Sequence, residues 1–382
     1  MRVTGAWLDN PDTQQVCKML TDAGYQALFV GGCVRNSLLG TPVSDIDLST
    51  DAPPQRVIAL AKAAKLKAIP TGIDHGTVTV VAGGLPHEIT TFRKDVETDG
   101  RRAVVAYSDS ILDDARRRDF TMNALYARPD GTVIDPLDGY RDLQERRVRF
   151  IENPTLRIQE DYLRILRFFR FTAWYGDPEA GFDQGGLGAI AENLDGISTL
   201  SKERVWAELK KLLLAPDPAP AIATMRSVGA LGQILSGADD RWLAVLVHTE
   251  NTIGLTPNAI SRLAVIGGVE PETTFRLSKS EASQLMLLRD QIGSMMPASA
   301  LGFQFGATTS KQILALRAAL FEVPVNTDDL VRAEQGANAV FPIQAADLMP
   351  GLSGSALGNK LKKLEERWIM SEFSLSREEL LR

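Results

Sequence analysis

One stretch, Leu28 to Ser49, constrains the fold more than any other part of the chain and reads LFVGGCVRNSLLGTPVSDIDLS. Residues 27–30 form a short apolar run typical of a strand, a glycine pair that ends in Gly32 breaks it, and a helical pattern follows as far as Gly40. Paired glycines let a backbone approach a phosphate closely, and the next helix offers unpaired N–H groups and a positive dipole end. This order predicts a nucleotide-binding phosphate loop at Gly32, with Arg35 adding a positive charge.

The second half of the stretch carries two carboxylates. Residues 43–48 alternate around Asp45 and Asp47, and residues two apart on a strand project from the same face. Paired carboxylates repel each other unless a cation lies between them, and Mg²⁺ prefers carboxylate oxygens, waters and substrate phosphates. Two such ions about 4 Å apart activate an attacking oxygen and stabilise a leaving one. Asp45 and Asp47 are therefore predicted to be catalytic metal ligands for nucleotidyl transfer, against the alternative of an ordinary turn and a solvated loop edge.

These motifs resemble a known family. GG-x-V-R, then L-L-G, then D-I-D is similar to the first motif of the class II tRNA nucleotidyltransferases, the CCA-adding enzymes, and of the related bacterial poly(A) polymerases, within the DNA polymerase β-like superfamily. The resemblance implies an α+β fold, in which a polymerase β-like head with a small mixed sheet precedes an all-helical C-terminal region. The family usually carries Asp directly after the arginine, where this chain has Asn36. We interpret Asn36 as a tolerated change beside the phosphate loop.

Composition narrows the protein class and the compartment. The 382 residues are 44% apolar and 24% charged, which is typical of a soluble globular protein of two to four structural units. No apolar run approaches the roughly 18 residues of a membrane span, and the first residues lack a signal-peptide core. Cys17 and Cys33 are the only cysteines and the three histidines are scattered, which disfavours a disulfide framework or a zinc site. A reducing compartment, the cytoplasm, is predicted.

The net charge of −6 argues against a generic nucleic-acid binder, which is normally basic. An acidic protein that binds RNA must rely on local basic patches and on shape. Any RNA interaction is therefore expected to be local rather than a property of the whole surface.

A third carboxylate is predicted on a neighbouring strand. After a helix over residues 55–67, two strands over 77–82 and 87–92 are joined by a glycine pair in hairpin fashion. Glu88 lies in the second of these strands and is the candidate that completes a two-metal catalytic site, against the alternative of a plain edge-strand charge. Residues 93–110 lack an apolar pattern in their first part and predict a mobile, exposed loop. The resemblance implies that such a loop helps the enzyme switch between nucleotides, whereas composition alone fits a solvated connector equally well.

A second motif follows in residues 111–127, which read ILDDARRRDFTMNALYA and roughly keep helical spacing. A run of three arginines is usually a solvated face, but RRDFTMNA resembles the second motif of the family. By that resemblance Arg118 binds the triphosphate and Asp119 lies near the ribose hydroxyls. The chemistry agrees, because arginine presents a planar fork to phosphate and a carboxylate accepts a hydrogen bond from a 2′-OH.

A third motif lies in residues 157–171, RIQEDYLRILRFFRF, which predict a helix. Asp161 and Arg164 either form an i, i+3 salt bridge or read a base. Cytosine and adenine present an amino donor beside a ring acceptor, and guanine and uracil present the reverse, so one fixed Asp and one fixed Arg accept C and A. E-D-x-x-R resembles the nucleotide-selecting motif of the family, and Arg167 and Arg170 match its further nucleotide-contacting positions.

The remaining chain predicts helices. Residues 201–214 resemble the last motif of the family and predict a helix that supports the preceding one through Arg204 and Glu208. Three parts are expected: a catalytic nucleotidyltransferase head over 1–142, a helical neck for nucleotide selection over 143–215, and a helical body and tail for tRNA binding over 216–382.

The predicted function is addition of C, C and A to the 3′ end of tRNA from CTP and ATP, with Mg²⁺ and without a nucleic-acid template. The expected partners are tRNA, CTP and ATP, with no membrane and no DNA. One alternative is a poly(A) polymerase or an enzyme adding only the C residues or only the A; TTFRKD, in place of a G-R-R-F-R-like segment, favours CCA addition. The other alternative is an inactive RNA-binding protein. The presence of Asp45, Asp47 and Arg118 argues against this alternative.

Overall fold

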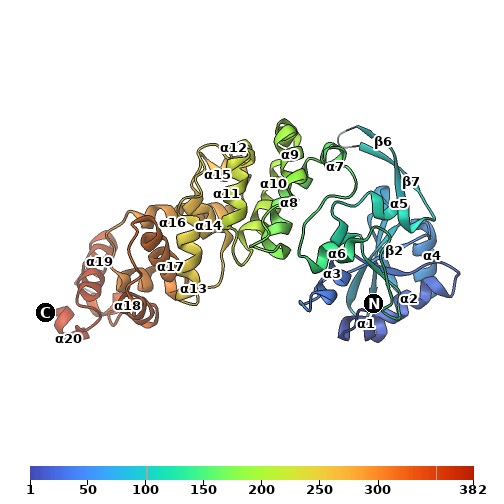
Figure 1. The fold of residues 1–382 in the computed structure, drawn as a ribbon. Coiled ribbons are helices and arrows are strands. Elements are labelled where there is room, and N and C mark those ends of the chain that lie inside the picture. Colours follow the sequence, from blue (N-terminus) through green and yellow to red (C-terminus); the bar gives the residue numbers. More distant parts are fainter. Residues whose placement is uncertain (100–101, 350) are drawn as a thin grey trace. The chain divides into compact units, whose positions relative to one another are not determined.

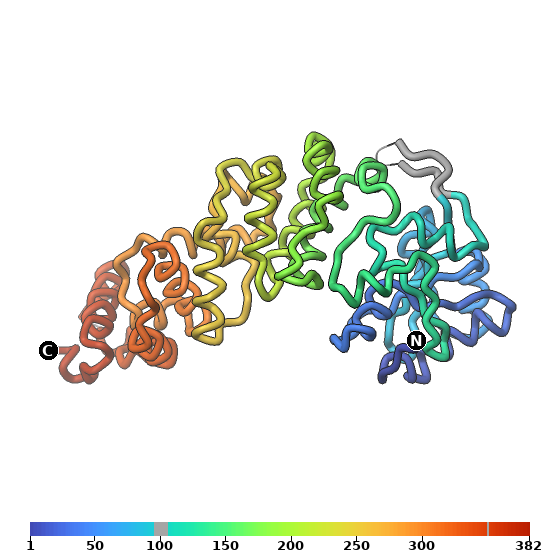
Figure 2. Tube along the Cα trace, viewed as in Figure 1, coloured from blue at the N-terminus to red at the C-terminus, as the bar shows by residue number. Residues whose placement is uncertain are grey.

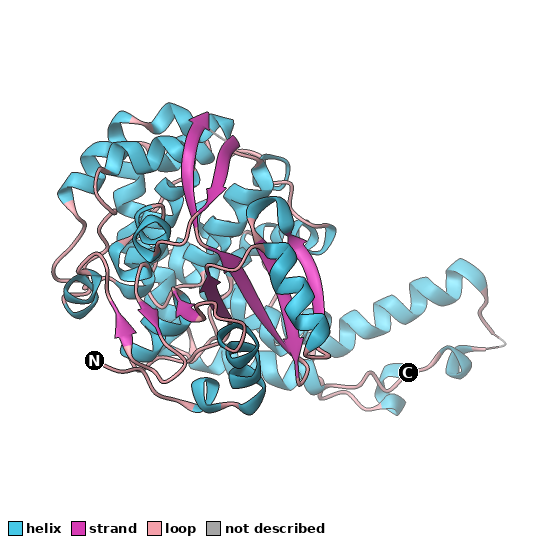
Figure 3. Ribbon diagram, turned by 90° about the vertical axis from the view of Figure 1, so that its right-hand side faces the viewer, coloured by secondary structure: helices cyan, strands magenta, loops and turns pink. Residues whose placement is uncertain are grey.

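The computed structural model describes residues 1–99, 102–349 and 351–382, which form two compact units. The first unit comprises Met1–Leu212 and Ser227–Ile234, and the second comprises Leu213–Arg226 and Leu235–Arg382. Within the described residues, every strand belongs to the first unit (Figures 1 and 3). No helix among the described residues of either unit is long and apolar enough to cross a membrane. The predicted α+β class, with strands before an all-helical remainder, is confirmed.

The larger sheet has seven strands in the order β3-β4-β5-β2-β1-β8-β9. Strands β2 and β5 run parallel, and the other neighbouring pairs run antiparallel, so the sheet is mixed as expected. Its strands are β1 Leu28–Val30, β2 Ile46–Thr50, β3 Lys67–Gly72, β4 Thr77–Ala82, β5 Leu85–Thr91, β8 Tyr126–Ala127 and β9 Val133–Ile134.

Two helices cover one side of this sheet. The helices α2 (Pro11–Thr21) and α4 (Pro54–Ala63) pack against β4 and β5 and bury apolar positions at helical spacing. His87 of β5 is buried on this side, where its Nε2 lies 3.0 Å from the hydroxyl of Thr13 in α2. Because neighbours along a strand point to opposite faces, Glu88 faces the other side of the sheet.

The other side of the sheet packs on a small apolar core that includes Leu28, Val30, Phe92 and Tyr126. The connecting helices of this part are short. They are α1 Ala6–Asp9, α3 Gly32–Leu38, α5 Ile111–Arg116 and α6 Gly139–Gln144. Ala115 belongs to this core and Ile111 packs against it, so α5 lies on this side of the sheet.

Five helical segments complete the first unit before the chain enters the second. They are α7 Pro154–Glu160, α8 Leu163–Tyr175, α9 Gln184–Glu192, the 3₁₀ segment η3 Leu194–Thr199 and α10 Lys202–Leu213, most of which lies in this unit. Phenylalanine rings join α8 to the sheet-bearing part: Phe120 lies 5.0 Å from Phe150 and 5.0 Å from Phe171, measured between ring centroids. Such buried aromatic contacts fix α8 against the segment that carries the second motif.

The second unit is built from helices (Figure 2). Helices α17 and α18 lie so close together that a Cβ at Gly302 would collide with the carbonyl oxygen of Ala333. A separate apolar core near the C-terminal end contains Ile343, Leu364 and Trp368. The helices after α10 are α11 Ala219–Ser227, α12 Ala230–Ile234 (which belongs to the first unit), α13 Leu243–Thr252, α14 Ala259–Ile266, α15 Pro271–Thr274, α16 Lys279–Ile292, α17 Ala298–Leu320, α18 Thr327–Asn338, the 3₁₀ segment η4 Ala345–Leu348, α19 Gly354–Met370 and α20 Arg377–Leu381.

The structure differs from the predicted elements in two strand regions. The helix expected over 55–67 ends at Ala63, because Lys65 adopts a left-handed φ of 58° and β3 begins at Lys67. The loop expected over 93–110 is largely an antiparallel pair, β6 (Arg93–Asp99) with β7 (Arg102–Tyr107). Residues 100 and 101 of that predicted loop lie outside the described residues. Backbone hydrogen bonds form this hairpin, and they require no apolar pattern in the sequence.

Two predicted helices are shorter than expected. The helix over 111–127 ends at Arg116, and the chain beyond it forms a 3₁₀ turn and then β8, where Tyr126 pairs with Val30. The helix over 157–171 is interrupted at Asp161, whose backbone is extended (φ −155°, ψ 103°). The Asp161 side chain accepts a hydrogen bond from the backbone N–H of Leu163, 3.1 Å away, which satisfies a free donor at the start of α8.

Candidate active site

The predicted metal ligands lie at and just before β2. Asp47 is in the strand and pairs in parallel register with Glu88 of β5, so the two side chains share a face. Asp45 immediately precedes β2 and is exposed. Burial and the neighbouring charge of Glu88 raise the pKa of Asp47 to about 6. A half-buried carboxylate beside two others is a site where a cation would relieve repulsion, so Asp45 and Asp47 fit a divalent ion as oxygen donors.

The third predicted carboxylate, Glu88, does not complete a metal site with Asp45 and Asp47 in the described residues. Among residues 1–99, 102–349 and 351–382, no three His, Cys, Asp or Glu side chains are close enough together to hold a metal ion. Glu88 is a strand neighbour of Asp47 and influences its pKa, but its own side chain is exposed. Its catalytic role stays a prediction.

Arg118 is held firmly beside the glycine turn. Its Nε donates to the hydroxyl of Tyr126 at 3.1 Å, and its Nη2 donates to Ser49 Oγ at 3.2 Å and to Asp114 Oδ2 at 3.1 Å. A Cβ placed on Gly31 would lie 3.6 Å from the remaining nitrogen, Nη1. The guanidinium is thus oriented on one side by protein groups, and its Nη1 lies beside the glycine turn.

The anchor of Arg118 is a buried carboxylate that we did not predict. Asp114 is fully buried, and although burial alone would raise its pKa, the charges of Arg118 and Arg117 lower it. Its Oδ2 also accepts a hydrogen bond from Tyr126, at 2.7 Å. The i, i+4 spacing of Asp114 and Arg118 was visible in the sequence and is the signal that identifies this pair.

The glycine turn has the predicted form, but Arg35 is engaged with the protein. Gly31 adopts a φ of 70°, which favours glycine, and α3 begins at Gly32. Arg35 is only 6% exposed, and burial lowers its pKa. Its guanidinium donates to Asn123 Oδ1 at 2.5 Å and to the hydroxyl of Tyr175 at 2.8 Å. A direct contact between Arg35 and a phosphate stays a prediction.

Asn36 takes part in the same cluster. Its Oδ1 accepts hydrogen bonds from Nε and Nη2 of Arg35, at 3.2 and 2.9 Å. The amide therefore supplies an acceptor next to Arg35 without adding a negative charge.

Asp119 and Arg167 are brought together although they lie far apart in sequence. Oδ2 of Asp119 accepts from Nε of Arg167 at 2.7 Å, and Oδ1 accepts from Nδ2 of Asn123 at 2.9 Å. Burial by itself would raise the pKa of Asp119, but Arg167 and these hydrogen bonds hold it at about 2. Asp119 is thus an ionised acceptor, and both of its oxygens have protein partners.

The two predicted base readers do not pair with each other in the described structure. Asp161 Oδ2 accepts from Nη2 of Arg204, on α10, at 2.7 Å. Arg164 donates to Glu160 Oε2 at 2.5 Å and to the backbone carbonyl of Arg117 at 2.8 Å. The alternative interpretation, an i, i+3 salt bridge between Asp161 and Arg164, is therefore wrong. Each of the two side chains has other partners.

Arg170, the last predicted nucleotide contact, also binds α10. Its Nε donates to Oε2 of Glu208 at 2.5 Å, and the guanidinium lies 4.5 Å from the ring centroid of Phe171. Arg157, which we did not predict as a site residue, donates to the carbonyl of Arg116 at 2.7 Å. Together with Arg164 it ties the end of α5 to the following helices.

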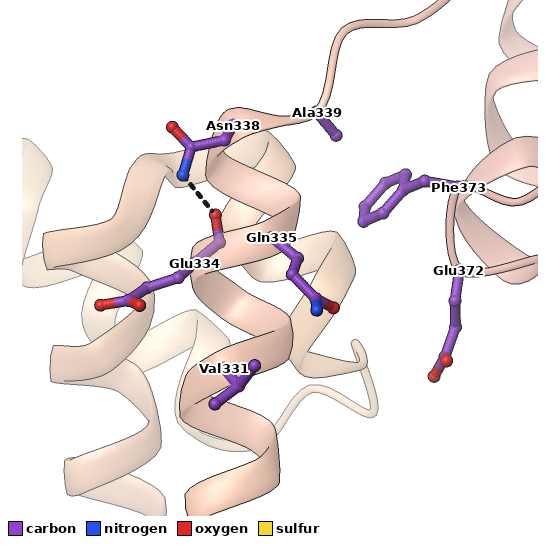
Figure 4. Close-up of a pocket in the computed structure, with 7 residues that line it drawn as sticks. All are labelled: Val331, Glu334, Gln335, Asn338, Ala339, Glu372 and Phe373. Atoms are coloured by element: carbon purple, nitrogen blue, oxygen red, sulfur yellow. Dashed lines mark hydrogen bonds between the residues drawn. The ribbon is translucent and has the colours of Figure 1, made fainter.

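A pocket of the second unit has a different character (Figure 4). Glu334 of α18 and Glu372 contribute carboxylates to its lining, and Phe373 contributes an aromatic ring. Asn338 donates its side-chain N–H to the carbonyl of Glu334 at 2.9 Å. The described residues that line this pocket include no lysine or arginine to bind a phosphate, in contrast to Arg118 of the first unit, so the candidate active site remains in the first unit.

Comparison with known proteins points to one family. Residues 27–149 match the family described as "Poly A polymerase head domain", and residues 186–241 match "Probable RNA and SrmB- binding site of polymerase A". The mitochondrial CCA tRNA nucleotidyltransferase 1 of Mus musculus is 31% identical over 383 residues, covering 96% of this chain and 88% of the relative. The CCA-adding enzyme of Lacticaseibacillus paracasei is 41% identical over 204 residues, covering 53% of this chain and 50% of the relative.

The fold agrees with solved structures. The CCA-adding enzyme of Bacillus stearothermophilus in complex with CTP superposes with a TM-score of 0.75 and 26% identity, covering 95% of this chain and 94% of that structure. The Thermotoga maritima CCA-adding enzyme complexed with tRNA has the same fold, with a TM-score of 0.70 and 20% identity over 99% of this chain and 97% of that structure. A nearly full-length relative above 30% identity, this fold and the ordered motifs together establish that the chain is a nucleotidyltransferase and belongs to the CCA tRNA nucleotidyltransferase family.

Proposed function

We propose that the protein adds C, C and A in turn to the 3′ end of tRNA, using CTP and ATP and no nucleic-acid template. The observation that carries the proposal is the position of Arg118, which is anchored by Asp114 and Ser49 while Nη1 faces the glycine turn. Asp47 lies two residues before Ser49 on the same strand and so projects from the same face. A triphosphate bound by the glycine turn and Arg118 would place its reacting end near Asp47.

The proposed reaction is a displacement at phosphorus. The 3′ oxygen of the tRNA attacks the α-phosphorus and forms the new ester bond, while the bond from that phosphorus to the bridging oxygen breaks. Pyrophosphate leaves with the electron pair, and the hydroxyl proton passes to solvent. The protein contributes by holding the triphosphate with Gly32 and Arg118 in fixed geometry, because positioning and preorganised charge supply most of the catalysis in phosphoryl transfer.

We further propose Mg²⁺ as the ion for which Asp45 and Asp47 are the ligands, with Glu88 as the candidate third carboxylate. When bound, such an ion neutralises phosphate charge and activates an oxygen nucleophile. The supporting observation is the donor set: oxygen ligands only, with Asp47 half-buried beside the charge of Glu88.

Base selection is assigned to the helices that follow the head. Asp161 presents carboxylate acceptors and Arg164 guanidinium donors, the set that matches the Watson–Crick edges of C and A and mismatches those of G and U. Arg167 and Arg170 are proposed as further nucleotide contacts, and Asp119 as the acceptor for the ribose 2′-OH. Arg164 donates to the carbonyls of Arg157 and Arg117 and to Glu160, which uses three of its five N–H groups, so base reading would use the remaining N–H groups.

The three parts of the chain receive proposed roles. Residues 1–142 are the catalytic head, 143–215 the nucleotide-selecting neck, and 216–382 the body and tail that bind tRNA. The likeness to an enzyme solved with tRNA supports the last assignment through the shared fold. The cytoplasm is proposed as the compartment because Cys17 and Cys33 are both buried as free thiols. Since the mouse relative is named mitochondrial, imaging of the tagged protein in its own cells decides between the two compartments.

The function is tested with tRNA transcripts that lack the last one, two or three nucleotides, each incubated with one NTP at a time. CCA addition predicts CMP incorporation on the transcripts lacking three or two nucleotides, and AMP incorporation on the transcript lacking one. Incorporation of CMP alone or AMP alone would identify a partial enzyme, repeated AMP addition would identify a poly(A) polymerase, and no incorporation with intact tRNA binding would identify an inactive RNA-binding protein.

A further inference from the structure

Helix α10 carries two opposite charges one turn apart, and each meets an opposite charge among the proposed base-reading residues. Nη2 of Arg204 lies 2.7 Å from Oδ2 of Asp161. Oε2 of Glu208 lies 2.5 Å from Nε of Arg170, and its Oε1 lies 3.8 Å from Nη1 of Arg167. Helix α10 thus places the cation of Arg204 against Asp161 and the anion of Glu208 against Arg167 and Arg170.

The Asp161 side chain is oriented by its contacts and not by a helix. It lies in the extended break between α7 and α8, so no helical backbone fixes the direction of its side chain. Two contacts define the carboxylate instead: Oδ1 accepts from the backbone N–H of Leu163 and Oδ2 accepts from Arg204. Loss of Arg204 would leave the hydrogen bond from Leu163 and the nearby charge of Arg167, neither of which fixes the direction of Oδ2.

The carboxylate remains available to a ligand while it holds Arg204. The Asp161 side chain is 35% exposed and the Arg204 side chain is 38% exposed. Each carboxylate oxygen can accept more than one hydrogen bond, so Oδ2 can accept from a base amino group and from Arg204 together. Arg204 is therefore compatible with base reading and need not be displaced by it.

We propose that Arg204 is a positioning residue for base selection: it orients the Asp161 carboxylate so that its acceptor meets the amino group of cytosine or adenine. This inference rests on the proposed function of Asp161. Arg204 acts only through Asp161, and its removal changes which base enters rather than the rate for every base alike. Glu208 is less suited to a test, because it contacts two arginines whose effects would overlap.

The test is a double-mutant cycle with Asp161→Ala, Arg204→Ala and the double variant. Arg204→Lys is added as the conservative variant and Lys211→Ala as the control, since Lys211 lies on the same helix with an exposed side chain. For each protein, kcat/KM is measured for single addition of all four NTPs, with pyrimidines on a tRNA transcript lacking CCA and purines on one lacking only the A. Thermal unfolding and tRNA binding of each variant report whether it folds.

Arg204→Ala is expected to lower the CTP-to-UTP and ATP-to-GTP ratios of kcat/KM about threefold to tenfold, the size of a coupling between directly contacting residues. The double variant is expected to be no less selective than Asp161→Ala alone. Arg204→Lys should recover part of the selectivity, because lysine keeps the charge but lacks the planar fork. Lys211→Ala should select as the wild type does. If Arg204→Ala unfolds, the Arg204→Lys variant carries the comparison.

Equal proportional losses for all four NTPs in Arg204→Ala would overturn the inference, as would a double variant whose selectivity loss is the product of the single losses. These outcomes differ from failure of the proposed function. If the wild type does not prefer CTP and ATP, or if Asp161→Ala keeps the full preference, the assignment of Asp161 as a base reader fails and takes the role of Arg204 with it. If Asp161→Ala loses selectivity and Arg204→Ala does not, only the inference about Arg204 is wrong.

Discussion

Oδ2 of Asp119 lies 2.5 Å from Nη2 of Arg167, and this ion pair joins the segment after α5 to helix α8. The carboxylate side chain is only 8% exposed, and its other oxygen accepts hydrogen bonds from Asn123 and from the backbone N–H of Phe120. Two residues predicted for different tasks, ribose recognition and base contact, are therefore parts of one hydrogen-bonded unit.

Asp119→Ala is expected to narrow the preference for ribonucleotides over deoxyribonucleotides and also to lower kcat/KM for CTP and ATP. The first effect follows because a carboxylate near a 2′-OH favours the nucleotide that carries the hydroxyl. The second follows because Arg167 loses the nearer of the two carboxylates that it contacts. Parallel kinetics with NTPs and dNTPs check both effects. An unchanged NTP-to-dNTP ratio, with reduced turnover, would mean that Asp119 only holds Arg167 and that another group reads the sugar.

The same pair predicts a pH dependence of stability. The pKa of Asp119 in the folded protein is depressed to about 2. Its contribution to the free energy of unfolding is therefore fully present above its ordinary pKa and is lost as the pH falls toward 2. That contribution is roughly 2 kcal/mol. The difference in free energy of unfolding between wild type and Asp119→Asn should therefore shrink between pH 5 and pH 2. A difference that stays constant over this range would show that Asp119 does not carry the ionised pair.

Asp45→Ala and Asp47→Ala are each expected to abolish incorporation of both CMP and AMP, with folding and tRNA binding nearly intact. The reason is that the displacement at phosphorus needs the divalent ion for which these residues are the proposed ligands. Incorporation assays, thermal unfolding and filter binding of labelled tRNA test the prediction together. Turnover at the wild-type level in either variant would remove that carboxylate from the metal site.

The second unit contains a buried ion pair whose role is structural. Arg262 and Glu250 are 0% and 1% exposed, and Nη1 of Arg262 also donates to the carbonyls of Leu213 and Ala215, both at 2.6 Å. Arg262→Met should destabilise this unit by about 3 to 5 kcal/mol, because it leaves a buried carboxylate unpaired. The double variant Arg262→Met with Glu250→Leu should recover only part of this loss, because the carbonyls of Leu213 and Ala215 lose their hydrogen bonds from Arg262. Chemical denaturation measures both, and full recovery in the double variant would mean that the carbonyl contacts contribute nothing.

Local patterns in the sequence were sufficient to predict the order of elements around the candidate site. The glycine turn, α3 and the strand after it follow from residues within one stretch, and Arg118 contacts Ser49 on the strand that carries Asp47. The break at Asp161 was missed because apolar spacing continues from α7 into α8, while the interruption is a local change of the Asp161 backbone to an extended conformation. Strand β3 was missed because its residues lack a buried alternating pattern.

The partners of the site residues that lie far away in sequence could not be predicted. Asp161 meets Arg204 across 43 positions, and Arg164 meets the carbonyl of Arg117 across 47. Such pairs depend on the packing of helices, which periodicity along one segment does not specify. Sequence spacing alone suggested a contact between Asp161 and Arg164, whereas tertiary packing brings Arg204 to Asp161 and the Arg117 carbonyl to Arg164.

The central claim, ordered CCA addition without a template, is tested most directly by sequencing 3′ ends. A tRNA transcript lacking CCA is incubated with the protein, a divalent ion and all four NTPs at equal concentration, and the added nucleotides are read molecule by molecule. We expect that the dominant product ends in C, C and A and grows no further, with U and G essentially absent. A tail of repeated A, a mixture that includes U and G at the positions of C and A, or an unextended 3′ end would contradict it.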